Sequence, residues 1–296
     1  MRITQRAVTL TSLQGLNRNL DAFSKLQEQL TSGKMLSAPS DSPTGTNKAM
    51  QTRAEQDATA QYKRNISDGQ SWLNQTDSTL QQMLNVARRV RDLTVQGSNT
   101  GAMSDTARKA LAAETTTLRE SLLGMANTSV AGRPMFGGIT AGPKAYDTAT
   151  GAYVGQAGPG TEMLRRVSST DSVRVDISGR EAFEGAGTDL FALVERITTN
   201  LTADPAGLEQ DLADLDVVMN NMKSAVADVG ARSARIDREA EINMGQSIAL
   251  ETGLSQVEDI DLPNMMMRLK MQQTGYEAAL SATAKAISPT LMDYLR

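Results

Sequence analysis

The sequence predicts a mainly α-helical protein, an elongated rod of long antiparallel helices with its N- and C-terminal helices paired as a coiled coil. Apolar residues recur in steps of three and four over long stretches, the period of helices that pack along a narrow seam. Aromatic residues make up only 3% of the chain, and sixteen methionines join the leucines on the apolar faces. Eleven of the 23 glycines fall within residues 130–187, which indicates a small β-rich insertion there.

The first predicted helix covers Thr9 to Leu30, and Gly33 supplies a stop just beyond it. Its polar flanks include Gln27, and so short a helix cannot bury an apolar stripe alone. We therefore expect this stripe to be an assembly seam. It consists of Leu10, Leu13, Leu16, Leu20, Phe23, Leu26 and Leu30.

The longest pattern predicts a helix from about Thr44 to Gln96, with Ser42 as its N-cap and Pro43 in its first turn. Ile66 to Thr94 keeps the three-four spacing without a slip. We expect its inward residues to form the core of the rod, including Ile66, Leu73, Leu80, Met83 and Val90.

A helix capped by Ser104 or Asp105 is expected to fold back along this long helix. The insertion after it is interpreted as a surface module with one half-buried strand, in which Val173, Val175 and Ile177 alternate with polar residues.

Helical spacing resumes at Leu190, and Asp204 with Pro205 predicts the start of a long returning helix. Its expected core residues are Leu212, Leu215, Met222, Val229 and Ile236. The acidic residues Asp211, Asp214 and Asp216 lack the central glycine of a calcium loop, and their helical spacing favours a solvated face.

Asp261 and Pro263 open the last predicted helix, which Pro289 is expected to kink. We expect Gln272 on its polar flank. Its stripe can pair with that of the first helix and is the second half of the expected assembly seam. It contains Leu262, Met266, Leu269, Tyr276, Leu280, Ile287, Leu291 and Tyr294.

These elements suggest three regions. Residues 1–34 and 262–296 form a terminal coiled-coil segment, residues 35–129 and 188–261 form a helical rod domain, and residues 130–187 form the β-rich insertion.

The composition excludes most active sites. The chain has neither Cys nor His, so it lacks thiolate nucleophiles, imidazole bases and their usual metal sites, and we expect no enzyme activity, cofactor or metal. A net charge of -4 argues against nucleic-acid binding. No apolar run is long enough for a membrane span, and no cleavable signal peptide is recognisable.

Several motifs resemble the flagellin-like axial proteins of the bacterial flagellum. LTSGKMLSAPSDSPTGTNKAM resembles their loop after the first helix, and YKRNISDGQSWLNQTDSTLQQM with RRVRDLTVQGSNTG resembles their long helix. The opening MRIT, the central GRPMFGGI and the ending DLPNMMMRLKMQQTGYEAALSATAKAISPTLMDYLR are most similar to the hook-filament junction members of that family.

This resemblance implies a secreted structural subunit, exported unfolded by the flagellar type III system, that joins the hook-associated ring to the filament and folds its termini on assembly. The partners it implies are hook-associated protein 1, flagellin, neighbouring copies of the chain, and an export chaperone at the C-terminal helix. The absence of Cys agrees with export of an unfolded chain.

Two alternatives stay open. A short flagellin would share both ends of the chain, and would polymerise into long filaments. A secreted coiled-coil effector, or an enzyme with carboxylate-only chemistry, belongs to another class, and the enzyme would need paired acids in a cleft.

Overall fold

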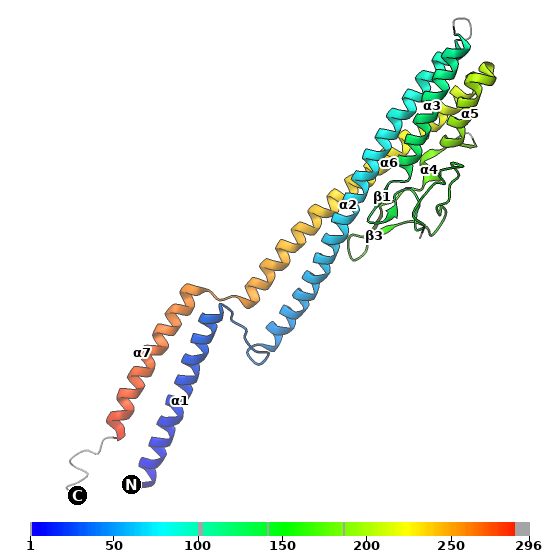
Figure 1. The fold of residues 1–296 in the computed structure, drawn as a ribbon. Helices are drawn as coiled ribbons and strands as arrows, with labels where there is room; N and C mark the ends of the chain where they lie inside the picture. The colour runs from blue at the N-terminus through cyan, green and yellow to red at the C-terminus, as the bar shows by residue number, and fades with distance from the viewer. Residues whose placement is uncertain (1, 100–102, 141, 186, 288–296) are drawn as a thin grey trace. The chain divides into compact units, whose positions relative to one another are not determined.

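The chain is helical over most of its length in the computed structural model, which describes residues 2–99, 103–140, 142–185 and 187–287 (Figure 1). The helices are α1 (Arg2–Ser32), α2 (Pro43–Ser98), α3 (Asp105–Ala126), α4 (Gly179–Phe183), α5 (Leu190–Ala203), α6 (Leu208–Glu258) and α7 (Leu262–Ile287), with a 3₁₀ turn η1 (Pro205–Gly207). The strands form three antiparallel pairs: β1 (Ser129–Val130) with β2 (Arg133–Pro134), β3 (Leu164–Arg166) with β4 (Ser172–Arg174), and β5 (Glu184–Gly185) with β6 (Thr188–Asp189).

The chain divides into two compact units. The first combines Met1–Ala58 with Gln246–Arg296, and the second is Thr59–Gly245. Helices α2 and α6 contribute to both, because each crosses a boundary. The predicted class is confirmed: long antiparallel helices dominate, the terminal helices α1 and α7 pack together, and a small β-rich insertion follows α3.

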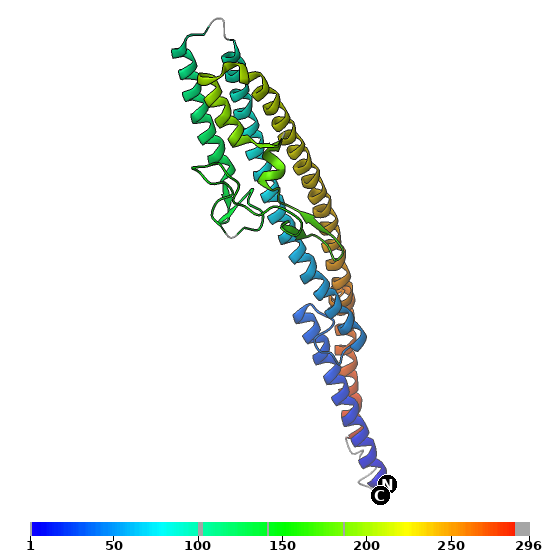
Figure 2. The ribbon, with the colours of Figure 1, turned by 90° about the vertical axis from the view of Figure 1, so that its right-hand side faces the viewer.

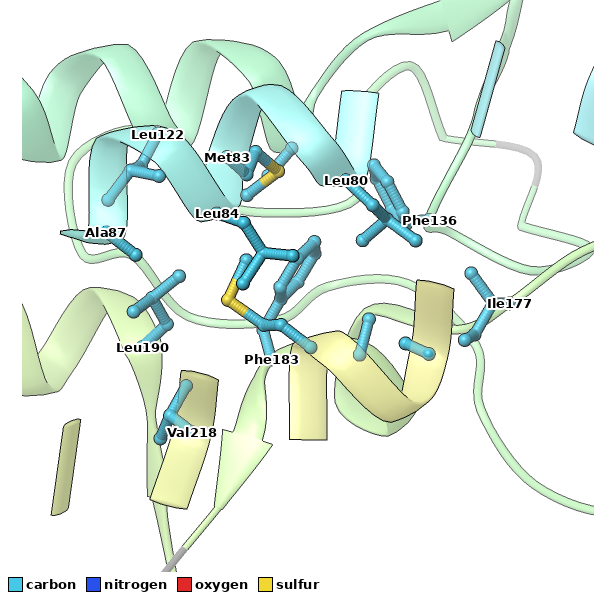
Figure 3. Packing of buried hydrophobic residues seen from close by; sticks show 14 of the residues in the cluster. Leu80, Met83, Leu84, Ala87, Leu122, Phe136, Ile177, Phe183, Leu190 and Val218 are labelled. Atoms are coloured by element: carbon cyan, nitrogen blue, oxygen red, sulfur yellow. The ribbon is translucent and has the colours of Figure 1, made fainter. Parts of the chain in front are cut away.

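In the second unit, α2 and α6 run antiparallel. Arg91 bonds to Asp216 and Gln70 to Asp237, so residue numbers rise on one helix as they fall on the other. Helices α3 and α5 pack beside each other in the same unit (Figures 1 and 2). The elements of this unit share one apolar core. Figure 3 shows part of it, where Leu80 and Leu84 of α2 lie near Phe136 and Phe183.

The expected core residues occupy this unit. Nine of them are buried: Ile66, Leu73, Leu80, Met83, Val90, Leu215, Met222, Val229 and Ile236. Leu212 is half-buried. Gly69 faces Ile236 so closely that a Cβ atom there would lie 2.9 Å from the isoleucine side chain, which explains a glycine in the middle of the seam.

The insertion is not the surface module that the sequence suggested. Phe136, Tyr146 and Phe183 are completely buried, and the ring of Tyr146 packs edge-on against Phe191 of α5, with centroids 4.5 Å apart. The insertion therefore adds large aromatic side chains to a core in which the helices outside it contribute Trp72 and Phe191. The composition suggested a separate module because most residues of the insertion belong to glycine-rich loops, whereas its buried aromatic residues are few.

The predicted strand is also shorter than expected. Strand β4 ends at Arg174, and the polar residues Asp176 and Ser178 are buried rather than exposed. The carboxylate of Asp176 accepts hydrogen bonds from the backbone of Met163 and from Arg174. Ser178 caps α4 in a capping box with Glu181. These polar residues are turn and cap groups, which a period-two pattern cannot separate from the solvent face of a strand.

The acidic residues Asp211, Asp214 and Asp216 of α6 are ion-paired, and only Asp216 keeps much of its side chain, 46%, in solvent. Arg196 of α5 donates to both Asp211 and Asp214, and Arg91 donates to Asp216. The side chain of Asp211 is only 2% exposed. The prediction failed because the arginine partners come from other helices. Asp204 likewise makes no side-chain cap, since η1 intervenes before α6 begins.

Candidate assembly surface

The first unit has very little apolar core of its own. Among its described residues, Ala49 and Met265 are the only buried apolar ones, whereas the core of the second unit contains many large side chains. Helices α1 and α7 nevertheless pack against each other. They run antiparallel, since Ile260 donates to the carbonyl of Gly33 and Gln272 to that of Asn19.

The contact between α1 and α7 uses one stripe of each helix, which we call the inner face. Its residues are half-buried, apart from the buried Met265, and keep heptad spacing. They are Leu16, Asn19, Phe23, Leu26 and Leu30 of α1, and Met265, Leu269, Gln272, Tyr276 and Ala279 of α7.

The other part of the predicted seam faces solvent. The side chains of Leu10, Leu13, Leu20, Leu262, Met266 and Leu280 are between 44% and 59% exposed. The single stripe expected from the sequence is thus two adjacent stripes, one between α1 and α7 and one open. The backbone of Ile287 closes α7, and Leu291, Tyr294 and Pro289 lie outside the described residues.

Gln272 was expected on the polar flank and lies on the inner face instead. The side-chain nitrogen of Gln272 is 3.2 Å from the backbone carbonyl oxygen of Asn19 and 3.4 Å from the side-chain oxygen of Asn19. A polar pair inside a two-helix seam fixes the register of the helices, because any shift leaves these groups without partners. Apolar residues alone guided the prediction, so it could not locate this pair.

A second set of polar residues, which the sequence analysis did not identify, joins the last residue of α6 to the loop after α1 and to α2. The Glu258 carboxylate, 4% exposed, accepts from Lys34 at 2.5 Å and from Arg53 at 2.7 Å. These cations lower the pKa of Glu258. The backbone of Met35 also donates to the carbonyl of Glu258.

Asp41 organises the loop between α1 and α2. Its carboxylate accepts from Lys25 of α1 at 2.6 Å and from the backbone nitrogens of Ser37 and Ala38. The ammonium of Lys25, together with these N–H groups, lowers the pKa of Asp41. Gly33 adopts a φ of +70°, the left-handed conformation expected of a residue that ends a helix.

These arrangements suit binding between helices more than chemistry. Across the described residues, no three acidic side chains gather where they could hold a metal ion. No helix in that part of the chain combines the length and the hydropathy needed to cross a bilayer.

Comparisons with known proteins agree. Residues 3–141 match the bacterial flagellin N-terminal helical region, and residues 212–295 match the bacterial flagellin C-terminal helical region. The chain is 24% identical to flagellar hook-associated protein 3 of Escherichia coli K12, over 95% of this chain and 96% of the relative. It is 26% identical to a flagellin of Listeria monocytogenes, over 97% of this chain and 96% of the relative.

The fold is also found in a solved structure, that of the flagellar junction protein FlgL from Legionella pneumophila. The two share 16% identity and a TM-score of 0.58, over 72% of this chain and all of that one. The relatives are structural proteins of the flagellum and not enzymes. Because the two family models together match well over half of its residues, the chain belongs to the bacterial flagellin family and has a structural role in the flagellar axis.

Proposed function

We propose that this chain is the subunit that joins the hook-associated ring to the flagellin filament. The observation that carries the assembly role is the imbalance between the two units. The second unit buries a complete apolar core, while α1 and α7 leave leucine and methionine side chains in solvent. Such a stripe gains its burial free energy, about 25 cal/mol per Å² of apolar surface, when a neighbouring subunit covers it.

The position at the junction rests on the motifs of the central region and the C-terminus, and on similarity to hook-associated protein 3 and to a protein named for the junction. A flagellin is the second candidate, because a Listeria flagellin is equally similar. The partners in either case are other axial proteins and neighbouring copies of the chain.

Export belongs to the same proposal. The chain leaves the cell unfolded through the flagellar type III system, bound at its C-terminal helix by an export chaperone, and orders α1 and α7 fully on assembly. The absence of Cys supports passage as an unfolded chain. The small apolar core of the first unit supports late ordering, since few buried contacts oppose its opening.

A deletion strain tests the junction. We expect electron micrographs to show hooks without filaments, and flagellin to accumulate in the medium because nothing retains it on the hook. Absence of flagellin from the medium, together with long filaments formed by the purified chain, would identify a filament subunit instead.

A further inference from the structure

A groove of about 310 Å³ lies between α2 and α6 in the second unit. Along the two helices it is placed between the pair of Gln70 with Asp237 and the pair of Arg91 with Asp216. The residues that line it are polar or apolar but never acidic. They are Gln81, Leu84, Asn85 and Arg88 of α2, and Lys223 and Val226 of α6.

The groove brings two cations together without an acid. Arg88 and Lys223 are both exposed, and no carboxylate in the described part of the chain forms an ion pair with either. Asp216 does not fill this role, because both of its oxygens accept hydrogen bonds from Arg91. Arg91, with a smaller long-range contribution from Lys223, lowers the pKa of Asp216. Two positive charges on facing helices repel each other, so the groove attracts an anion.

Several hydrogen-bond donors of the groove are unused. The guanidinium of Arg88 donates one bond, at 2.8 Å, to the side-chain oxygen of Asn85, and the ammonium of Lys223 donates one, at 3.1 Å, to Asn220. Within the described residues, the other donors of Arg88 and Lys223 and the side-chain nitrogen of Asn85 make no hydrogen bond. A guanidinium with free donors binds both oxygens of a carboxylate at once, and an ammonium adds a point charge.

The apolar lining narrows the choice of anion. Leu84, labelled in Figure 3, is 5% exposed and belongs to the core, and Val226 is half-buried. A bare inorganic ion gains nothing from these side chains, whereas a carbon chain loses contact with water when it covers them.

We infer that the groove binds a carboxylic acid, with carboxylate oxygens on Arg88 and Lys223 and the carbon chain on Leu84 and Val226. The acid is a dissolved molecule or an Asp or Glu side chain of a neighbouring protein, and the two sources present the same chemistry. Neither reading depends on the place of the chain in the flagellum.

Titration calorimetry of the full purified chain with glutarate, a short dicarboxylate, tests the inference at constant ionic strength. We expect saturable binding, with inorganic phosphate binding much more weakly. Arg88→Gln and Lys223→Gln should each weaken glutarate binding by about tenfold or more, since each removes a charge-assisted contact. Lys63→Gln removes an exposed cation elsewhere on α2 and is the charge-matched control, which should leave the affinity unchanged.

Both groove variants should fold, because Arg88 and Lys223 are exposed. Thermal unfolding checks this, and loss of one of two like charges should not lower the midpoint. The absence of saturable binding would overturn the inference, as would equal weakening by Lys63→Gln. Phosphate binding as tight as that of glutarate would overturn the role of the apolar lining.

Maleimide labelling separates the two sources of the acid. Gln81→Cys places a thiol in the groove without removing a cation, in a chain that has no cysteine of its own. Equal labelling rates in the isolated chain and in isolated flagella identify a dissolved acid. Much slower labelling in flagella identifies an acidic side chain of a neighbouring protein, provided that Gln82→Cys, an exposed neighbour outside the groove, is still labelled.

Discussion

Glu258 and Lys34 are 224 residues apart in the chain, yet the carboxylate of one and the ammonium of the other are 2.5 Å apart. Arg53 binds the same carboxylate. This cluster ties the end of α6 to the loop that follows α1, so it connects the two turns from which the terminal helices start. Its carboxylate is buried while both cations are more than two-fifths exposed, so solvent screens part of the attraction.

Replacing Glu258 by Gln should therefore loosen these turns without unfolding the second unit. We expect the amides of Met35 and Ile260 to exchange roughly 5- to 30-fold faster, equivalent to about 1 to 2 kcal/mol. The matched control is Glu251→Gln, an exposed carboxylate on the same helix, which should leave exchange unchanged. Equal effects of both variants would show that the cluster has no special role.

The same cluster should make the stability of these turns depend on pH. Lys34 and Arg53 lower the pKa of Glu258, so the folded state holds its proton less tightly than the unfolded state does. Its contribution to stability is present above the ordinary Glu pKa of about 4.3 and is lost as the pH falls through the lowered value. Exchange at Met35 should accelerate below about pH 4 in the wild type, and Glu258→Gln should remove that acceleration.

Charges on the exposed leucines of α1 and α7 should block assembly but not folding. Leu20 and Leu280 are 45% and 44% exposed, so Leu20→Asp and Leu280→Asp should change the stability of the isolated chain by at most about 0.5 kcal/mol. Both variants should be exported and fail to build junctions, because assembly would bury an unpaired carboxylate.

Leu80→Asp is the contrast, since Leu80 is completely buried and the charge should cost more than about 4 kcal/mol. Gln27→Asp is the surface control and should behave as the wild type. Thermal unfolding of each purified variant measures these differences. If Leu280→Asp lowered stability as much as Leu80→Asp, then α7 would be ordinary core, and ordering on assembly would be wrong.

Removal of residues 262–296 should abolish assembly and leave the second unit folded. Within 262–287, the part of the deleted segment that the structure describes, no residue belongs to the apolar core of that unit. In the isolated full-length chain, amides of 262–287 should exchange much faster than those of 66–94, because α7 has little buried surface holding it. Equal protection of the two segments would contradict the proposal that the termini order on assembly.

The buried carboxyl of Asp189 should make the stability of the second unit depend on pH, with the sign opposite to that of Glu258. Burial raises its pKa to about 6, although the backbone of Phe191, Tyr146 and Arg119 oppose the shift and Glu184 adds to it. The folded state therefore binds more protons than the unfolded state between about pH 4 and 6, and stability decreases as the pH rises through that window. The free energy of unfolding falls by up to about 3 kcal/mol across that window.

Asp189→Asn should remove this slope while preserving the cap of α5, since Asn is as good an N-cap as Asp. Urea unfolding at pH 4.5 and 7.5 measures it. We expect the variant to gain stability relative to the wild type at pH 7.5 and not at pH 4.5. An equal difference at both values would mean that Asp189 is ionised throughout.

The sequence alone determined the helices, their approximate ends and the family. Unbroken three-four spacing located α1, α2, α6 and α7, because a helix shows its packing face through its period. Local groups marked the ends, as Ser42 and Ser104 do by accepting hydrogen bonds from the backbone three residues on. Nine of the ten α2 and α6 residues that the same pattern predicted for the core are buried in the second unit.

The tertiary structure alone decided which residues meet across long separations. Arg196 forms ion pairs with Asp211 and Asp214, and Gln272 donates a hydrogen bond to Asn19, because other helices supply partners that no local pattern contains. It also decided that the insertion belongs to the core. Above all, it separated one predicted seam into an inner face and a second stripe that is open to solvent, since spacing gives the direction of a stripe but not the position of its partner.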